Sequence, residues 1–329
     1  MRVLVTGGAG YIGSHTVKAL AVAGFEPMVL DDLSNGHRAA VGDHLLIEGN
    51  IGDGALVRET LKSYEIGAVL HFAASAYVGE SVRNPRKYFD NNVANTLTLL
   101  GAMLDSGVRT IVFSSSCATY GAASGLLRED TPQLPVNPYG WSKLMVEQIL
   151  KSYGRAFDLK WLALRYFNAA GADPDGELGE QHDPETHLLP LLIQAALGMR
   201  GPVDIFGTDY PTPDGTAIRD YVHVADLAEA HVLGLRHLLS GGQSQAMNLG
   251  TGTGHSVKQA LEAVGAAVGS PVPIRYAPRR EGDPAELVAD PALAQEVLGW
   301  HPRWSHLETI VSTAHSWQTR VAGLGQERR

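Results

Sequence analysis

The chain has 329 residues, of which 44% are hydrophobic, so it can bury the core of one large domain or two ordinary ones, and disorder is excluded as its main state. The formal net charge is −9 and no long basic run occurs, which argues against nucleic acid or an anionic membrane surface as the main partner. The single cysteine, Cys117, excludes internal disulfides and any multi-cysteine metal site.

No targeting or membrane segment is evident. The N-terminus lacks a charged region followed by a cleavage site, Gly7 and Gly8 interrupt its first apolar run, and no run of 18 apolar residues occurs. We therefore expect a cytoplasmic protein that does not contact a membrane. The 13 histidines match neither HExxH nor a zinc-ribbon spacing, so we expect no metal site.

The first half of the chain alternates short apolar runs with helical patterns. The runs are RVLVT, PMVL, HLLIE, AVLHF, TIVFS and WLALRYF. This rhythm predicts βαβ units and an α/β fold with a doubly wound parallel sheet. Beyond Asn168 loop-rich stretches interrupt shorter elements, which predicts a first domain at 1–168 and a smaller α/β domain at 169–329, with some later segments returning to the first.

The segment TGGAGYIG follows the first predicted strand and opens a helix. Its glycines match both GxGxxG and GxxGxxG, and in this context they indicate a Rossmann-type turn that brings backbone N–H groups to a pyrophosphate. Asp31 follows 18 residues after Gly13, where its carboxylate accepts hydrogen bonds from a ribose diol and repels a 2′-phosphate. NAD is thus favoured over NADP, and the alternative is a tight turn with a surface acid.

Three serines, Ser114 to Ser116, end the buried-looking strand TIVFS. Strand ends of this kind bind ligands in open α/β sheets, although serine also serves as a cap or turn residue. A helix then begins at Pro138 with Asn137 as its N-cap, so Tyr139 and Lys143 share one face. A separate apolar stripe is expected from Trp141, Leu144, Met145 and Ile149.

In this order, the glycine turn, Asp31, FAA at 72–74, DNN at 90–92, the serines and the Tyr139/Lys143 pair resemble the extended short-chain dehydrogenase/reductases. Within that superfamily the resemblance to the UDP-galactose 4-epimerase family is close and covers nearly the whole chain. Its most discriminating segments are LRYFNAAGADPDG, PETHLLP, DIFGTDYPTPDGTAIRDYVHVADLAEAH and APRREGDPAEL.

The resemblance implies an NAD-binding Rossmann domain, a UDP-sugar-binding domain, and UDP-glucose and UDP-galactose as small-molecule partners in galactose metabolism. It also implies a homodimer formed through helices near 89–104 and 140–154. The catalytic set implied is Ser116, Tyr139 and Lys143. The NAD site would comprise Gly7, Gly10, Tyr11, Ile12, Asp31, Asn35, Asn50, Ile51, Phe72, Ala73, Ala74, Asn91, Ser114, Tyr139, Lys143 and Phe167. The UDP-sugar site would comprise Ser116, Tyr139, Asn168, His187, Leu188, Phe206, Arg219, Arg280, Asp283 and Leu287.

The chemistry of these residues suits the implied reaction. Arg219 and Arg280 provide forked cationic donors for a diphosphate in an otherwise acidic chain. The hypothesis is that Tyr139, its pKa lowered by the Lys143 ammonium and by nicotinamide, takes the C4 hydroxyl proton with Ser116 as relay. Hydride passes to NAD, a 4-keto sugar forms, and hydride returns to the opposite face. Cys117 is expected to be a packing residue.

Four positions depart from the family pattern. Asn50 stands where many relatives carry Asp, and its amide oxygen is still expected to accept a hydrogen bond from the adenine amino group. Ala76 stands where some relatives place a lysine near the cofactor. His187 replaces Asn, and Leu287 replaces the tyrosine that some relatives place beside the C2 substituent of the sugar.

Other readings stay open at the level of sequence. They are another UDP-sugar 4-epimerase acting on N-acetylhexosamine, pentose or uronate, a nucleotide-sugar dehydratase, an ordinary dehydrogenase that releases NADH, and a non-catalytic NAD-sensing protein. The dehydratase is weakened because SSCATYG lacks the acid pair that such enzymes carry. The sensing protein is weakened because all three catalytic groups are present.

Overall fold

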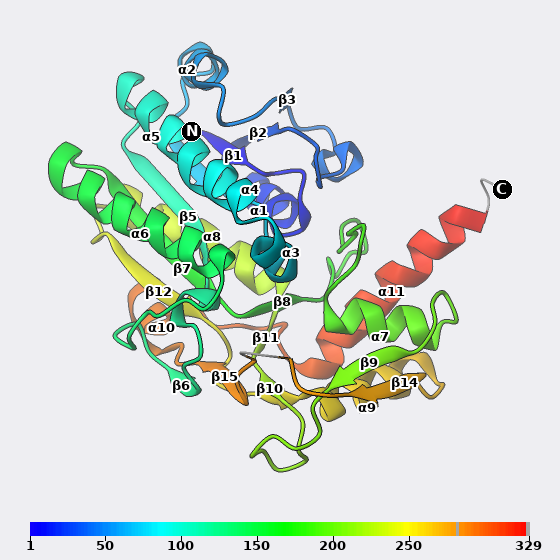
Figure 1. Ribbon diagram of the computed structural model, residues 1–329. Coiled ribbons are helices and arrows are strands. Elements are labelled where there is room, and N and C mark those ends of the chain that lie inside the picture. Colours follow the sequence, from blue (N-terminus) through cyan, green and yellow to red (C-terminus); the bar gives the residue numbers. More distant parts are fainter. Residues whose placement is uncertain (281–282, 327–329) are drawn as a thin grey trace.

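The computed structural model describes residues 1–280 and 283–326, and a seven-stranded parallel sheet lies at its centre (Figure 1). The order of its strands is β12-β7-β5-β4-β1-β2-β3. The bounds are β1 Arg2–Thr6, β2 Glu26–Asp31, β3 Leu46–Glu48, β4 Ala68–His71, β5 Thr110–Ser116, β7 Lys160–Tyr166 and β12 Gln245–Leu249. Six of these strands coincide with the apolar runs of the sequence, which confirms the predicted α/β fold with a doubly wound sheet.

Both faces of the sheet are buried, which explains why its strands have continuous apolar sequences. In β1, Val3 and Val5 pack in the core on one face while Leu4 packs in the core on the other. Successive side chains of a strand point to opposite faces, so a strand covered on both sides must be apolar at every position. The parallel pairing also places the carboxyl ends of all the strands at one edge.

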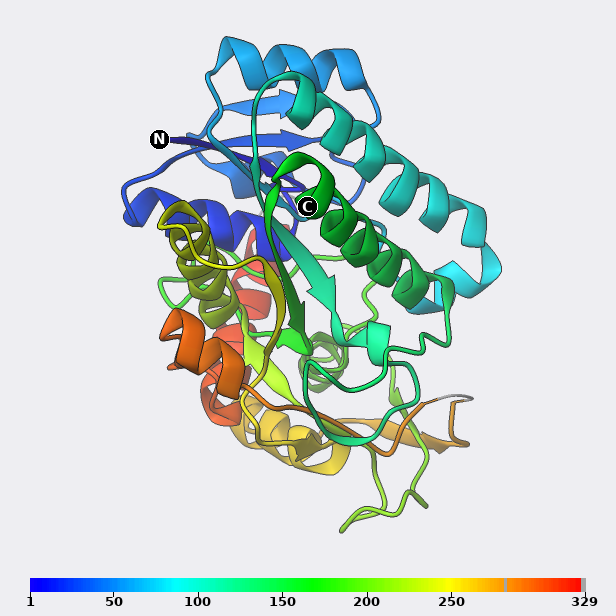
Figure 2. The same ribbon diagram turned by 90° about the vertical axis from the view of Figure 1, so that its left-hand side faces the viewer.

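Helices cover the two faces of the sheet, as the two orthogonal views show (Figure 1 and Figure 2). One face packs against α1 (Tyr11–Val22) and α8 (Val224–Leu239), and the other against α2 (Gly54–Ser63), α5 (Asn95–Asp105) and α6 (Pro138–Phe157). Because α8 and β12 come from the C-terminal half, the sheet and its cover draw on residues from both sides of Asn168.

A smaller region is built on short strands and three helices at the carboxyl edge of the sheet (Figure 1). Its core lies among α7 (Leu188–Ala196), α9 (Val257–Val268) and α11 (Leu307–Gln326). A four-stranded sheet has the order β13-β10-β15-β6, with bounds β13 His255–Ser256, β10 Ile218–Arg219, β15 Glu286–Ala289 and β6 Gly125–Leu127. Two strand pairs complete it, β8 Asn168–Ala170 with β11 Tyr221–His223, and β9 Val203–Phe206 with β14 Ile274–Ala277.

The remaining elements are short. They are η1 Arg38–Val41, α3 Val78–Arg83, α4 Pro85–Tyr88, η2 Phe89–Ala94, η3 Cys117–Tyr120 and α10 Ala292–Leu298. Within the described ranges, none of the helices has the length and apolar character needed to span a bilayer.

Helix α6 begins as the sequence predicts. The side chain of Asn137 accepts a hydrogen bond from Gly140 N at 2.8 Å, and Pro138 occupies the first turn. The expected apolar stripe is divided, however: Leu144 is buried, whereas Trp141 and Met145 keep 42% and 40% of their surface exposed. Burial instead follows the face that carries Tyr139 and Lys143.

Candidate functional site

In the glycine turn between β1 and α1, Gly7 and Gly13 have no room for side chains, because neighbouring backbone atoms lie too close. Gly7 adopts φ +73°, and a Cβ there would lie 2.5 Å from Ala73 N; a Cβ on Gly13 would lie 2.2 Å from Gly7 O. A Cβ on Gly10 would meet only Gly7 O, at 3.4 Å, so packing against the protein does not explain that glycine. No side chain caps the N-terminus of α1 at Gly10, and its first N–H groups are therefore suited to an anion.

Asp31 ends β2 beside this turn. Its Oδ2 accepts from Ala9 N and its Oδ1 from Leu33 N, both at 2.9 Å, while burial raises its pKa and these bonds act in the opposite direction. Asp32 follows it and accepts a hydrogen bond from the Asn50 side chain at 2.8 Å. Two adjacent carboxylates favour a ribose diol over a phosphate. These residues and the open turn therefore fit NAD.

Asn50 differs from the expectation that its amide oxygen would accept from adenine. Its Oδ1 already accepts from Gly52 N at 2.8 Å and from the Asn95 side chain at 3.1 Å. An amide oxygen has two lone pairs, so both are used within the chain. The side chain of Asn50 thus organises this end of the site through Asp32 and Asn95.

The other predicted cofactor residues gather along the same edge of the sheet. Ala73 follows β4, where its N–H donates to Thr6 O at 3.0 Å, and Asn91 in η2 donates to Ser75 Oγ at 3.2 Å. The set follows strand after strand: Asp31 and Asn35 after β2, Asn50 and Ile51 after β3, Phe72, Ala73 and Ala74 after β4, Ser114 in β5 and Phe167 after β7. Open α/β sheets bind ligands at this edge.

Lys143 is fixed against the end of β5. It is buried, and its Nζ donates to Ser114 O at 2.7 Å and lies 4.9 Å from the centroid of the Phe113 ring and 5.8 Å from that of Tyr139. Burial lowers its pKa to about 7, while the Glu147 carboxylate acts in the opposite direction. An amine with such a pKa exchanges protons near neutrality.

Tyr139 lies on the same buried face of α6. Burial raises the pKa of its phenol above the ordinary value of 10, and Ser116 acts in the opposite direction. In the protein alone burial therefore dominates, and the depressed pKa expected from sequence requires an additional positive charge next to the ring. Cys117 follows Ser116 and has a pKa raised to about 12, chiefly by burial, which agrees with a packing role.

A buried ion pair holds α6 on the sheet beneath these groups. Arg165 in β7 donates to Glu147 of α6 at 2.7 Å, and Ser115 in β5 donates to the same carboxylate at 2.6 Å. Glu147 lies one helical turn beyond Lys143, and Ser115 stands between Ser114 and Ser116. The pair therefore sets the position of α6 relative to both serines.

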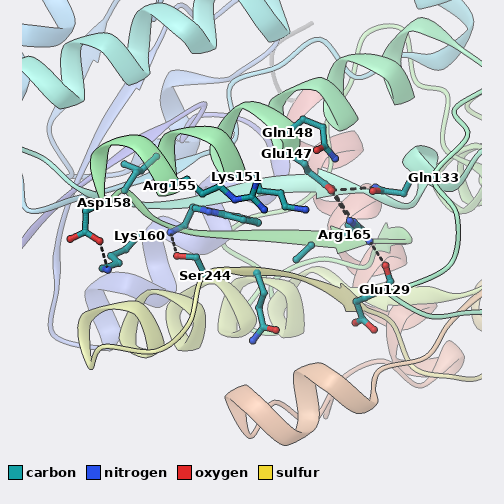
Figure 3. Close-up of a pocket in the computed structure, with 15 residues that line it drawn as sticks. Glu129, Gln133, Glu147, Gln148, Lys151, Arg155, Asp158, Lys160, Arg165 and Ser244 are labelled. Atoms are coloured by element: carbon teal, nitrogen blue, oxygen red, sulfur yellow. Dashed lines mark hydrogen bonds and ion pairs between the residues drawn. The ribbon is translucent and has the colours of Figure 1, made fainter.

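Figure 3 shows this ion pair at one wall of a pocket between α6 and the β7 and β12 strands. Its lining mixes both signs of charge, with Lys160 paired to Asp158 at 2.6 Å and Gln133 donating to Glu147. None of the predicted catalytic, cofactor or sugar residues, all of which lie in the described ranges, lines this pocket. It is thus separate from the carboxyl edge.

Apart from Ser116 and Tyr139, the predicted sugar residues lie in the smaller region, as three groups and the separate Asn168. Arg219 in β10 is ion-paired with Asp283 and lies opposite Leu287 of β15 in the strand register. Leu287 packs with Phe167 in a small apolar cluster.

The second and third groups lie on other elements. The guanidinium of Arg280 stacks 4.0 Å from the centroid of the Phe206 ring. His187 and Leu188 begin α7, and the side chain of His187 contacts Glu180. Asn168 begins β8 and donates its N–H to Asp220 O at 3.0 Å.

Three features escaped the sequence analysis. Besides the Glu147/Arg165 pair, the buried Asp220 carboxylate, between β10 and β11, accepts from Thr251 N, Thr251 Oγ1 and Ala289 N, and so ties this junction to β15 and to the segment after β12. Glutamates and histidines also gather at 180–187. The i, i+4 spacing of Glu147 from Lys143 could have indicated the Glu147/Arg165 pair. The Asp220 contacts and the gathering at 180–187 correspond to no familiar sequence motif.

Comparison with known proteins agrees with this geometry. A sequence model described as the NAD dependent epimerase/dehydratase family matches residues 3–250. The UDP-glucose 4-epimerase of Halalkalibacterium halodurans is 50% identical over 318 residues, which are 96% of this chain and 95% of that protein.

Solved structures are similar as well. The crystal structure of UDP-glucose 4-epimerase from Brucella ovis in complex with NAD is 52% identical, with a TM-score of 0.93 over 95% of this chain and 97% of that one. The UDP-glucose 4-epimerase from Bifidobacterium longum in complex with NAD+ and UDP is 38% identical, with a TM-score of 0.92 over 97% of this chain and 98% of that one.

Proposed function

Because the chain belongs to the NAD dependent epimerase/dehydratase family, we propose that it is an NAD-dependent enzyme that inverts C4 of a UDP-hexose and interconverts UDP-galactose and UDP-glucose. The observation that carries the proposal is the attachment of Lys143 to Ser114 O, which places Lys143, Tyr139 and Ser116 at the strand edge that also carries the glycine turn. Bound NAD supplies an acceptor and donor of hydride at C4.

Tyr139 acts as the general base and acid of this cycle. Its phenolate would take the proton of the C4 hydroxyl while C4 is oxidised to a ketone. After the sugar presents its other face, the phenol would give the proton back to the C4 oxygen as C4 is reduced, so no net oxidation occurs. Ser116 relays the hydrogen bond between Tyr139 and the C4 hydroxyl. The positive charges of Lys143 and of the nicotinamide of bound NAD would favour the phenolate of Tyr139.

The substrate is anchored by its diphosphate while the sugar turns. Arg219 and Arg280 are the proposed partners of the phosphates, since guanidinium donates in a fork and keeps its charge. The ion pair with Asp283 orients Arg219, and Phe206 supports Arg280. The binding energy of UDP is thereby independent of which face of the hexose is presented, which inversion requires.

A dehydratase is not favoured, because the segment after β5, Cys117–Tyr120, offers no acid pair. A 4-epimerase acting on N-acetylated sugars is the second candidate, and Leu287 favours it as a side activity. Leucine lacks the hydroxyl and the full volume of tyrosine, so space remains beside the C2 substituent.

We also propose that the enzyme is a cytoplasmic homodimer that serves galactose metabolism. Helices near 89–104 and 140–154 would pack across a two-fold axis. The support is apolar surface on α5 and α6, where Leu97, Trp141 and Met145 are 40%, 42% and 40% exposed.

The test is product identity with the protein as purified. Incubation with UDP-galactose, without added NAD, is expected to give UDP-glucose and no free NADH, because the cofactor is reduced and reoxidised in place. Denaturation of gel-filtered protein is expected to release nicotinamide nucleotide. Accumulation of NADH would support an ordinary dehydrogenase instead, and turnover only with added NAD would point to weak retention through the lysine missing at Ala76.

A further inference from the structure

The segment that joins β8 to α7 carries a compact histidine–glutamate cluster (Figure 1). Its members follow the spacing ExHxxExH, which matches none of the zinc signatures considered above. Each offers one ligand atom, and the four ligand atoms lie within 4.8 Å of one another. We call this group the 180–187 cluster; it consists of Glu180, His182, Glu185 and His187.

Two polar atoms in the cluster are buried without a hydrogen-bond partner among the described residues. They are Nδ1 of His182 and Oε2 of Glu185. The Glu185 side chain is only 6% exposed. Nδ1 of His182 lies 3.0 Å from Glu180 Oε1, yet the two atoms do not have the alignment of a hydrogen bond. A buried oxygen and a buried nitrogen that lack hydrogen-bond partners within one cluster are candidate ligands for a cation.

The surroundings supply the support that a metal site needs. Trp317 Nε1 donates to Glu180 O at 3.0 Å, and the N–H of His187 donates to Glu185 Oε1 at 2.9 Å. The rings of Tyr11 and Tyr77 pack edge-on against His182, with centroids at 6.3 Å and 6.0 Å. Contacts of this kind around a metal site orient the residues that bind the ion directly. The His187 side chain is 50% exposed and leaves an entry path.

We propose that the 180–187 cluster is a binding site for a divalent transition-metal ion, best matched to Zn²⁺. Two imidazoles and two carboxylates give mixed nitrogen and oxygen ligation, which suits zinc in four-coordinate geometry. In tetrahedral geometry, ligand atoms at zinc distances of 2.0–2.2 Å lie about 3.3–3.6 Å apart, so ligand atoms that now lie within 4.8 Å of one another must approach by up to about 1.5 Å. The ion itself takes part in no step of the epimerase reaction, although His187 also stands among the residues expected at the UDP-sugar site.

The position of the cluster gives the ion a structural role. Tyr11, the first residue of α1, packs on His182, and the backbone oxygen of Gln181 accepts from the His37 side chain at 3.0 Å. A bound ion would therefore fix this segment against the cofactor turn. Without an ion the same histidines and glutamates face one another as ion pairs. Metal binding and ion pairing therefore compete for the same side chains.

The experiment measures Zn²⁺ binding to untagged holoenzyme that has been treated with a chelator and dialysed. Competition with a chromophoric zinc indicator at neutral pH is expected to give one equivalent per chain. His182→Gln and Glu185→Gln should weaken binding by at least about tenfold, the scale seen even for outer-ligand changes. His301→Gln removes an exposed histidine outside the cluster and should bind as the wild type does.

Thermal unfolding provides a second measurement. Zn²⁺ should raise the Tm of the wild type and of His301→Gln but not that of His182→Gln, since an ion that binds only the folded chain stabilises it. Failure of the wild type to take up one equivalent at micromolar Zn²⁺ overturns the proposal, whatever the variants do. Equal binding by His182→Gln and His301→Gln overturns it as well, because the ion would then sit elsewhere.

Discussion

The cofactor edge and the sugar edge of the site are built in different ways. At the cofactor edge, backbone groups and buried side chains set the geometry: Gly7 meets Ala73 N, Asp31 accepts two backbone N–H groups, and Lys143 is held by Ser114 O. At the sugar edge, long side chains such as Arg280 reach from strands and loops and depend on other side chains for their positions.

This contrast teaches which properties the fold fixes and which a substitution can tune. A sheet edge made of backbone and glycine cannot change without changing the fold, so we expect the fold to fix the position of Tyr139 and of the groups proposed to bind the cofactor. The sugar edge rests on individual side chains. We therefore expect substitutions at the first edge to abolish chemistry or stability, and those at the second to shift affinity and specificity.

The largest effect is expected at the chemical group itself. Tyr139→Phe keeps the ring that packs with Tyr88 but removes the proposed acid/base oxygen, so kcat should fall by about 10²–10⁴. Stability and bound NAD should hardly change. Steady-state kinetics with UDP-galactose and a thermal melt measure both. If more than half of the wild-type kcat remained, Tyr139 would not be the base, and loss of the fold would assign it a packing role.

The next effect tests whether the cofactor edge depends on its buried support. Glu147→Gln leaves the Arg165 charge buried without its partner, which should cost about 3–5 kcal/mol of unfolding free energy. The same change removes the carboxylate that raises the pKa of Lys143, so kcat should fall as well. Urea unfolding of Glu147→Gln is compared with that of Glu59→Gln, an exposed glutamate on α2. Equal stability of the two variants would contradict the supporting role.

The sequence predicted most of the cofactor edge because its signals are local. Strand periodicity, the glycine turn and the Asn137 N-cap each depend on residues within a few positions of one another, and the structure confirms the fold and this cap. The support beneath it was not predicted. Arg165 and Glu147 come from different elements, and a sequence does not reveal that a charged pair will be buried.

The same limit applies to surfaces and to the 180–187 segment. Trp141 reads as a core residue in a helical pattern, yet it faces outward, because the buried side of α6 is set by packing on β5 and β7. His187 was assigned to the sugar from resemblance alone, while its contact with Glu180 comes from a loop that no periodicity describes.

At the sugar edge, removal of an arginine proposed to bind the diphosphate should change affinity more than rate. Arg219→Ala is expected to raise KM by about 10- to 100-fold, the equivalent of a charge-assisted hydrogen bond of about 1.5–3 kcal/mol, while kcat changes little. Arg275→Ala is the control, since Arg275 also pairs with an aspartate, Asp204, but lies exposed on β14. A fall in kcat without a change in KM would exclude Arg219 as an anchor of the diphosphate.

A smaller effect concerns the pH dependence of stability, and it tests a buried histidine on the face of the sheet that α8 covers. Burial lowers the pKa of His231 to about 4, and its ring packs on Phe72. The pKa of this histidine in the unfolded chain is near 6.5, so the unfolded chain binds the proton first as pH falls. The free energy of unfolding therefore decreases between about pH 6.5 and 4, by at most about 1.4 kcal/mol per pH unit. His231→Phe should flatten this slope in urea titrations at pH 7.5 and 5.0. An unchanged slope would show that other groups cause the loss.

The smallest effect is expected where the sugar edge meets the catalytic strand. Leu287 packs with Phe167 and lies opposite Arg219, and we propose that its side chain bounds the space near the sugar. Leu287→Tyr adds volume and a hydroxyl. It should depress kcat/KM for the N-acetylated UDP-hexoses about tenfold more than for UDP-glucose and UDP-galactose, because a modest change of pocket volume is worth about 1–3 kcal/mol. Leu126→Tyr, at an exposed position of neighbouring β6, is the matched control and should leave the ratio unchanged. An equal loss on both sugar pairs in Leu287→Tyr would mean that residue 287 does not line the C2 pocket, and that specificity is set by groups other than those of β15.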